Sequence, residues 1–477
     1  MGKFEAGYSV VARMKTWITE EYKNLNLGDK RLDKRCRAIV KMRSESPGSS
    51  IPKASMGNRA EMKATYRFLD NDMVTAQGLM QPHIDNTLAR CKDIDYVLVA
   101  HDTTNINLHG SPLDLGHIDN GTTNGVMMHS AMAISPSGLT LGLLYQKVWG
   151  RDRELHGQSN YSFRRPYEKK ESYKWEEGIN NCIKNLGDKR AIHICDREAD
   201  IYETLSMKRP AHHHLLVRYR HSRTTTEGQK VIEKLKEQTE ACRYTVSVVR
   251  GENRSPESVI LSIKFCKVEI KKPSGKKGEN LQMNAVMAEE VSENVEQLSE
   301  GDTTIGSPGK ILWILYTDIE VENAEKARWV VLLYTFRWLI ERFHFVLKSG
   351  CGVEKLQLRN SFEQIHRALA LLSVIAWRLM HLAYVARTEA EMPADDFLEK
   401  DEWEALCWWK HKTFDIQSEP PSIGEAVRWI AMLGGYIGRN NDGPPGTKTL
   451  WQGYLLLTEK AKDWRKFKDY LSTYQPP

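Results

Sequence analysis

Tyr96-Val-Leu-Val-Ala-His-Asp102 is a five-residue apolar run followed by a histidine and an aspartate. A similar pattern returns at Ala191-Ile-His-Ile-Cys-Asp196, where a run rich in Ile again leads into an aspartate. Short apolar runs of this kind predict strands buried in a sheet. The sequence therefore predicts two buried strands, each with an aspartate at its carboxyl end.

Further strand-like runs surround these two. Two apolar runs between residues 128 and 148 are separated by Pro136-Ser-Gly138, which predicts a hairpin. Leu215-Leu-Val-Arg-Tyr-Arg220 predicts another strand, and residues 172–186 have the pattern of a helix between strands. Because helices and strands alternate, we expect a mixed α/β core.

The chain has 477 residues, more than a single hydrophobic core usually supports, so we expect several domains. Residues 1–75 predict a small helical domain, broken at Pro47-Gly-Ser-Ser50. Residues 76–387 contain the strands, with a β-rich insertion at 235–312. Residues 388–477 predict a helical C-terminal domain that begins after an acidic, proline-containing linker.

The composition is that of an ordinary globular protein, with 41% hydrophobic and 27% charged residues. The most apolar stretch, Ala368 to Trp377, is shorter than the roughly 20 residues that span a bilayer, so we expect a buried helix and no membrane segment. The N-terminus has no apolar signal core, which favours a cytoplasmic protein. Eight scattered cysteines predict reduced thiols, and the run His212-His-His214 predicts no metal site because adjacent side chains alternate in direction.

Positive charge is concentrated near the N-terminus, where residues 1–72 contain 15 Lys and Arg against 9 Asp and Glu. Lys and Arg on phosphates provide the sequence-independent part of nucleic-acid binding. The excess is therefore consistent with a polyanionic partner, and equally with a solvated helix face.

The segment around Glu341 predicts the chemistry more sharply. On an ideal helix, Tyr334, Arg337, Glu341 and Lys348 point within about 60° of one another, while apolar residues cover the opposite side. A glutamate beside two cations and a phenol suits a metal ligand next to a phosphate clamp. The alternative is a solvated Arg337–Glu341 pair, worth a few tenths of a kcal/mol, which leaves the tyrosine unexplained.

Carboxylates at neighbouring strand ends suit Mg²⁺ or Mn²⁺, which prefer oxygen ligands. Taken alone, Asp102 and Asp196 are as well explained as turn or helix-capping residues. Together with Glu341 they form a candidate set of three carboxylates.

Several motifs resemble one family. Tyr334-x2-Arg337-x3-Glu341-x6-Lys348 is similar to the YREK signature of bacterial DDE transposases of insertion sequence group four, which includes the Tn-five transposase. His101-Asp102-Thr-Thr and Cys195-Asp196-Arg-Glu-Ala-Asp-Ile resemble its other acidic motifs. The resemblance extends from Leu27-Gly-Asp-Lys-Arg31 to Thr449-Leu-Trp-Gln-Gly453, nearly the whole chain.

The resemblance implies a ribonuclease-H-like catalytic core in which Asp102, Asp196 and Glu341 are both catalytic residues and ligands of two divalent metal ions, Mg²⁺ or Mn²⁺ as a substitute. It further implies cut-and-paste transposition: nicking at the transposon end, hairpin formation, hairpin opening and strand transfer into target DNA. The N-terminal domain would bind double-stranded DNA, and the C-terminal domain would join two subunits in a synaptic homodimer.

The resemblance also assigns DNA contacts. Tyr334, Arg337 and Lys348 would hold phosphates, and Trp313 would stack a flipped base, unless it is simply a core tryptophan. The further backbone contacts that it implies are Arg218, Arg220, Arg31 and Arg67. Phe345 stands where the family has a lysine, so one phosphate contact is in doubt.

Two other functions fit the same sequence. A domesticated nuclease or recombinase would keep the metal site without mobility, and a DNA-binding inhibitor of transposition would lack catalysis. The intact set of three acids and the basic N-terminal region argue against the inhibitor.

Overall fold

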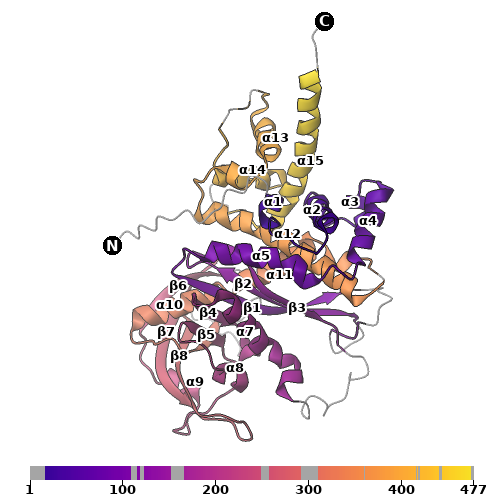
Figure 1. The fold of residues 1–477 in the computed structure, drawn as a ribbon. Coiled ribbons are helices and arrows are strands. Elements are labelled where there is room, and N and C mark those ends of the chain that lie inside the picture. The colour runs from indigo at the N-terminus through magenta and orange to yellow at the C-terminus, as the bar shows by residue number, and fades with distance from the viewer. Residues whose placement is uncertain are drawn as a thin grey trace. The chain divides into compact units, whose positions relative to one another are not determined.

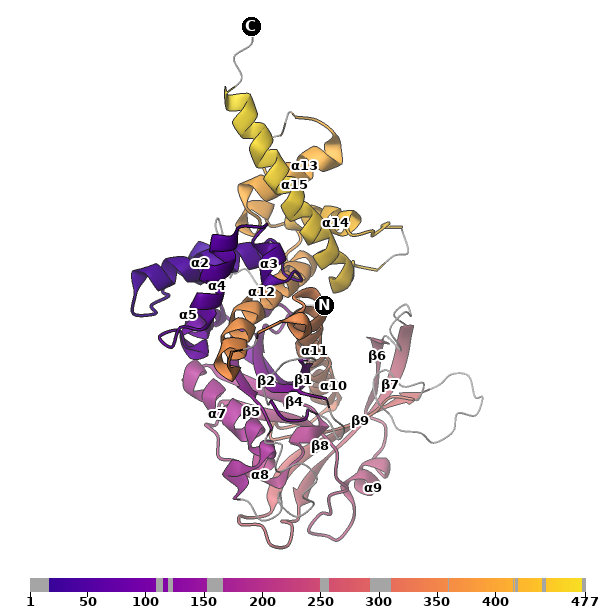
Figure 2. The same ribbon diagram turned by 90° about the vertical axis from the view of Figure 1, so that its right-hand side faces the viewer.

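The structure is a computed structural model that describes residues 17–108, 115–118, 123–151, 166–248, 257–291, 310–358, 360–414, 416, 419–439 and 443–473 (Figures 1 and 2). The chain divides into two compact units. The first comprises Met1–Asp95, Thr103–Tyr161 and Leu339–Pro477, and the second comprises Tyr96–Asp102 and Ser162–Trp338. The three domains predicted from the sequence are a different division and remain a prediction.

The second unit is built on most of a mixed sheet. Its strands are β1 (Tyr96–Asn107, of which this unit holds the first part), β4 (Arg190–Cys195), β5 (His213–Arg218), β6 (Cys242–Val248), β7 (Glu257–Ile270), β8 (Leu281–Val291) and β9 (Leu312–Thr317). Their spatial order is β1-β4-β5-β9-β8-β7-β6. The pairs β1–β4 and β4–β5 are parallel and the others are antiparallel. The predicted mixed α/β fold is confirmed; its ribonuclease-H-like character remains a prediction.

The predicted β-rich insertion contains β6, β7 and β8. These strands are not a separate sheet, because β8 pairs with β9 and β9 pairs with β5. The other elements of this unit are η2 (Tyr167–Lys169), η3 (Glu171–Tyr173), α7 (Lys174–Leu186), η4 (Arg197–Ala199), α8 (Tyr202–Ser206), α9 (Val231–Lys236) and α10 (Ala324–Thr335).

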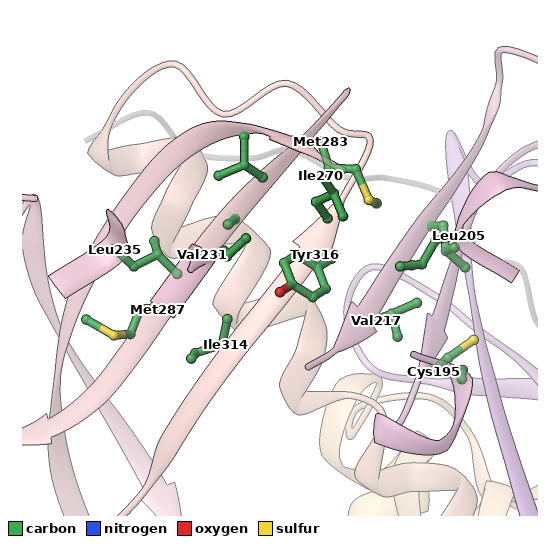
Figure 3. Close-up of a cluster of buried hydrophobic side chains, with 14 of the residues drawn as sticks. Cys195, Leu205, Val217, Val231, Leu235, Ile270, Met283, Met287, Ile314 and Tyr316 are labelled. Carbon is green, nitrogen blue, oxygen red and sulfur yellow. The ribbon is translucent and has the colours of Figure 1, made fainter. Parts of the chain in front are cut away.

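One face of this sheet is covered by an apolar core. Alternate residues of the strands, such as Cys195, Val217 and Tyr316, pack with side chains of α7 and α9 (Figure 3). Because side chains alternate along a strand, Asp196 and Arg218 must point to the opposite face. The hydrophobic core on one face therefore sets the orientation of the polar residues on the other.

The first unit is mainly helical. Its helices are α1 (Trp17–Glu21), α2 (Lys30–Ser44), α3 (Ile51–Ala54), α4 (Arg59–Leu69), α5 (Ala76–Cys91), α11 (Trp338–Phe345, beginning one residue before the unit), the π-helix η5 (Val346–Gly350), η6 (Val353–Lys355), α12 (Phe362–Thr388), η7 (Ala394–Asp396), α13 (Lys400–His411), α14 (Ile423–Leu433) and α15 (Thr447–Thr473). The predicted hairpin is present as β2 (Gly125–Ile134) and β3 (Thr140–Trp149). Gly138 adopts the positive φ of 91° that its turn requires.

Helix α12 forms the centre of this unit and contacts α5, β3, α14 and α15 (Figures 1 and 2). It has 27 residues, so it is longer than the apolar segment seen in the sequence, and it is long and apolar enough to cross a membrane. However, 94% of its most apolar window is buried inside the protein, as in the core helix of a globular domain. The prediction of a buried helix is confirmed.

A buried ionic cluster joins α1 to α5. Glu21 is 1% exposed and accepts a hydrogen bond from Arg90 Nη1 at 3.0 Å. His83 Nε2 accepts from the Leu143 amide, which leaves Nδ1 to donate to Glu21. Burial raises the pKa of Glu21, but the charges of Arg90 and His83 outweigh that effect and lower the pKa to about 2. A carboxylate removed from water in this way is stable only while its partners remain.

Candidate active site

Asp102 and Asp196 occupy equivalent positions on two neighbouring strands. β1 and β4 run parallel, and their last paired residues are Ala100 and Ile194. Each aspartate lies two residues beyond this pair, so both side chains project from the same face of the sheet. β1 continues to Asn107, so Asp102 lies within the strand and not at its end as predicted.

The two carboxylates repel each other. Burial raises the pKa of Asp196, and the nearby Asp102 carboxylate raises it further. Arg337 and a hydrogen bond from the Glu198 amide, at 2.8 Å, oppose these effects but leave the pKa at about 6. Two half-buried carboxylates that disfavour each other's charge fit a site for a divalent cation, which would reverse the repulsion.

Arg337 follows α10 and lies close to Asp196 and Tyr334. Its side chain is 6% exposed, and its guanidinium lies 5.7 Å from the centre of the Tyr334 ring. Burial raises the pKa of the Tyr334 hydroxyl, although the charges of Arg337 and Arg218 oppose that shift. One face of the second unit thus gathers five of the predicted site residues: Asp102, Asp196, Arg218, Tyr334 and Arg337.

Trp313 and Tyr334 are core residues in this structure. They are 3% and 2% exposed, and their rings pack edge to face with centres 5.4 Å apart. The aromatic pair must therefore open before Trp313 can stack on a base. Arg220, beyond the end of β5, is exposed.

The single regular helix predicted from Tyr334 to Lys348 is wrong. α10 ends at Thr335, a turn occupies Phe336 and Arg337, and Lys348 lies in the π-helix η5. The projection of four side chains onto one stripe assumed 100° per residue throughout, which these breaks do not allow. Glu341 lies on α11 in the first unit, half-buried, and Lys348 forms an ion pair with Glu354 at 3.8 Å.

Within the part of the chain that the structure describes, no three His, Cys, Asp or Glu side chains are grouped so that they could hold a metal ion. Asp102 and Asp196 come together in one unit, and Glu341 belongs to the other. The third ligand therefore remains a prediction. None of the eight cysteines, all of which lie in the described residues, forms a disulfide.

Asp200 is a buried carboxylate close to the site in sequence, and it was not predicted from the sequence. It is fully buried and accepts hydrogen bonds from the amides of Arg220 and His221, at 2.7 and 2.9 Å, and from the Arg223 guanidinium. This carboxylate ties the loop after β5 to the turn that begins at Asp196. The repeated acid in Asp196-Arg-Glu-Ala-Asp200 was the available signal.

Three histidines form a second feature that sequence reasoning missed. His101 Nε2 lies 3.0 Å from His193 Nδ1, and His193 Nε2 lies 3.1 Å from His213 Nδ1. His213 Nε2 reaches the Gly187 carbonyl at 3.4 Å. Because a carbonyl only accepts, each ring in this chain must carry its proton on Nε2. These buried hydrogen bonds link β1, β4 and β5 on the face opposite Asp102 and Asp196.

In the first unit, Arg31 and Arg67 are exposed. Arg31 lies in the first turn of α2 and pairs with Asp29 at 2.8 Å, while its side chain remains 92% exposed. Arg67 continues a row of exposed cations, Arg59 and Lys63, at intervals of four residues on α4. Residues four apart share one helix face, so α4 presents a basic edge.

Comparison with known families assigns both ends of the chain. Residues 14–74 match the family described as Transposase DNA-binding. Residues 374–473 match the family described as Transposase Tn5 dimerisation domain. The chain carries the DNA-binding and dimerisation domains of a transposase. The exposed basic row of the transposase DNA-binding domain lies on α4, and the match to the transposase dimerisation domain begins inside α12.

A similar solved structure is the cryo-EM structure of the piggyBac transposase synaptic complex with hairpin DNA. The two chains are 9% identical, with a TM-score of 0.37, and the likeness covers 98% of this chain and 83% of that one. A TM-score of this size does not establish a common fold.

Proposed function

We propose that this protein is a DDE transposase that moves a DNA element by a cut-and-paste reaction. It would nick the DNA at each element end, form and open a hairpin, and join the excised end to target DNA. The observation that carries this proposal is the equivalent placement of Asp102 and Asp196 beyond the Ala100–Ile194 pair. The transposase domains at the two ends of the chain support the DNA substrate and the dimer.

The chemistry requires a divalent metal. Two Mg²⁺ ions, or Mn²⁺ as a substitute, would activate the attacking oxygen and stabilise the leaving oxygen at phosphorus. Asp102, Asp196 and Glu341 are the residues that would hold them. Asp102 and Asp196 fit a cation, because they lie at equivalent positions on parallel strands and the raised pKa of Asp196 reflects negative charge that a cation would neutralise.

The protein's own side chains would position the DNA. Arg337 and Arg218 lie on the face that carries the two aspartates and can donate to the phosphates beside the cut, with Arg220 at the loop that follows. Tyr334, Lys348 and Trp313 are proposed to hold the strand end, while Arg31 and Arg67 would bind the DNA backbone further from the cut.

The test is to incubate the protein with DNA carrying both flanks of its own reading frame, in Mg²⁺. We expect an excised double-ended product in the wild type and none with Asp196→Asn, while both proteins shift the DNA in a gel. Cleavage by Asp196→Asn at the wild-type rate would refute the assignment. A wild type that nicks but never excises would favour a resident nuclease.

A further inference from the structure

A pocket in the first unit carries three arginines outside the site described above. Its volume is about 380 Å³, and it lies where the end of α12, the helix α14 and the segment after α14 meet. The residues on which the argument depends are Arg387, Arg428, Tyr436, Gly438, Arg439 and Pro445. Among the described residues that line the pocket, none is acidic. Its lining therefore carries three positive charges from three separate segments.

Two of these arginines are held by the backbone of the segment after α14. Arg387 Nη2 donates to the Pro445 carbonyl at 3.0 Å, and Arg428 Nη2 donates to the Gly438 carbonyl at 3.3 Å. A guanidinium has five N–H donors, so each retains donors for a ligand. Backbone hydrogen bonds reduce the freedom of these side chains, which lowers the entropy lost when an anion binds.

The backbone around the pocket is also specific. Tyr436 donates its hydroxyl to the Gly443 carbonyl at 2.8 Å, which bridges the segment. Gly438 adopts a φ of +70°, and a Cβ at this position would lie 3.4 Å from Arg428 Nη2. A glycine thus allows the chain to turn closely around the guanidinium.

We propose that this pocket binds a phosphate of the double-stranded DNA backbone. Arginine forks match the geometry of phosphate oxygens, and a concave, cationic lining whose described residues include no carboxylate favours an anion. The pocket lies inside the region matched to a dimerisation domain, so that region would hold DNA as well as a second subunit. The choice of DNA as the source of the phosphate rests on the proposed function.

The test measures the affinity of the full-length protein for a DNA duplex of random sequence at several salt concentrations. A protein that loses one phosphate contact loses about one unit of the slope of log K against log salt. We expect this loss in Arg428→Ala and a larger one in the double variant Arg387→Ala and Arg428→Ala. The loss of each arginine should weaken binding by up to about fivefold.

Lys400→Ala is the matched control, because Lys400 is exposed, pairs with Glu404 in the same helix and lies outside the pocket. It should leave the slope unchanged. Arg428→Lys keeps the charge but not the fork, so it should keep the slope and lose part of the affinity. Light scattering checks that each variant keeps the wild-type oligomeric state. If an alanine variant does not keep it, the loss of affinity in Arg428→Lys provides the test instead.

An unchanged slope in the double variant overturns the proposal. Calorimetry with inorganic phosphate alone separates the sources: phosphate binding that the double variant loses, with no change in the DNA slope, would assign the pocket to a small anion and also overturn it. If the double variant shows the reduced slope but the wild type never cleaves DNA, the pocket is kept and the transposase function is rejected. If the wild type cleaves DNA but the double variant has an unchanged slope, the transposase function is kept and the pocket proposal is rejected.

Discussion

Asp102 and Asp196 each lie two residues beyond the last pair of two parallel strands, Ala100 and Ile194, and each disfavours the other's negative charge. The backbone register brings the carboxylates together, and their repulsion raises the pKa of Asp196 to about 6. A site that is unfavourable without a cation is one that a cation stabilises.

The first prediction concerns this repulsion. Asp102→Asn removes the neighbouring charge, so the pKa of Asp196 should fall toward its ordinary value, and cleavage in Mg²⁺ should be lost. An NMR titration of the carboxyl carbons without metal measures the pKa, and a gel shift checks that DNA binding remains. Glu198→Gln is the control, because Glu198 is exposed and has a smaller effect on Asp196. An unchanged Asp196 pKa in Asp102→Asn would contradict the proximity of the two acids.

The second prediction is a pH dependence of metal binding. Asp196 is protonated below its raised pKa of about 6, and a proton competes with a cation for the same oxygen atoms. Mn²⁺ affinity should therefore be nearly constant above pH 6 and fall by about tenfold for each pH unit below it. Calorimetric titration with Mn²⁺ between pH 5 and pH 8 measures this. An affinity that does not fall below pH 6 would exclude Asp196 as a ligand.

The third prediction separates the two roles of Trp313. Because this side chain is 3% exposed and packs on Tyr334, Trp313→Ala should lower the free energy of unfolding by about 3–5 kcal/mol. If Trp313 also stacks a flipped base, the variant should slow hairpin formation more than the first nick, measured at a temperature where it remains folded. Equal slowing of both steps would make Trp313 a core residue only.

The fourth prediction concerns the histidine chain. His193→Phe keeps an aromatic ring but leaves the His101 donor and the His213 acceptor without their partner, which should cost about 2 kcal/mol or more. Chemical denaturation measures the loss, and His221→Phe on the exposed loop is the control. Nitrogen-15 NMR of the wild type should show all three rings protonated on Nε2. A different tautomer in His193 would disprove the proposed direction of the chain.

The fifth prediction is the stability of the ionic cluster around Glu21. Glu21→Gln leaves Arg90 with no carboxylate, and the unfolding free energy should fall by about 3–5 kcal/mol at neutral pH. The pKa of Glu21 is lowered to about 2, so its contribution is complete above pH 4.5 and is lost as the pH falls from 4.5 toward 2. Unfolding at pH 7 and pH 3 measures both effects. Glu20→Gln, an exposed neighbour, should change neither.

Much of the secondary structure followed from the sequence, because alternation and apolar runs depend on local residues. The strand that leads into Asp196, the hairpin around Gly138 and the helical character of the N-terminal region are present as predicted. The strand of Asp102 is also present, but it continues to Asn107 instead of ending at the aspartate. The prediction failed between Tyr334 and Lys348, where amphipathic periodicity gave no sign of the turn at Phe336 and Arg337 or of the π-helix. The π-helix packs against α15, a segment about 100 residues further along the chain, which a local pattern cannot include.

By itself, the sequence determined the two acids that follow apolar runs, the basic N-terminal region and the aromatic and cationic residues near Glu341. Only the tertiary structure decided that Asp102 and Asp196 share one face, that Trp313 and Tyr334 are buried together, and that Asp200 anchors the loop carrying Arg220. Strand register and burial depend on residues far apart in the chain. A local pattern can predict that an aspartate follows an apolar run. The pairing of two strands decides which other charged side chain lies beside that aspartate.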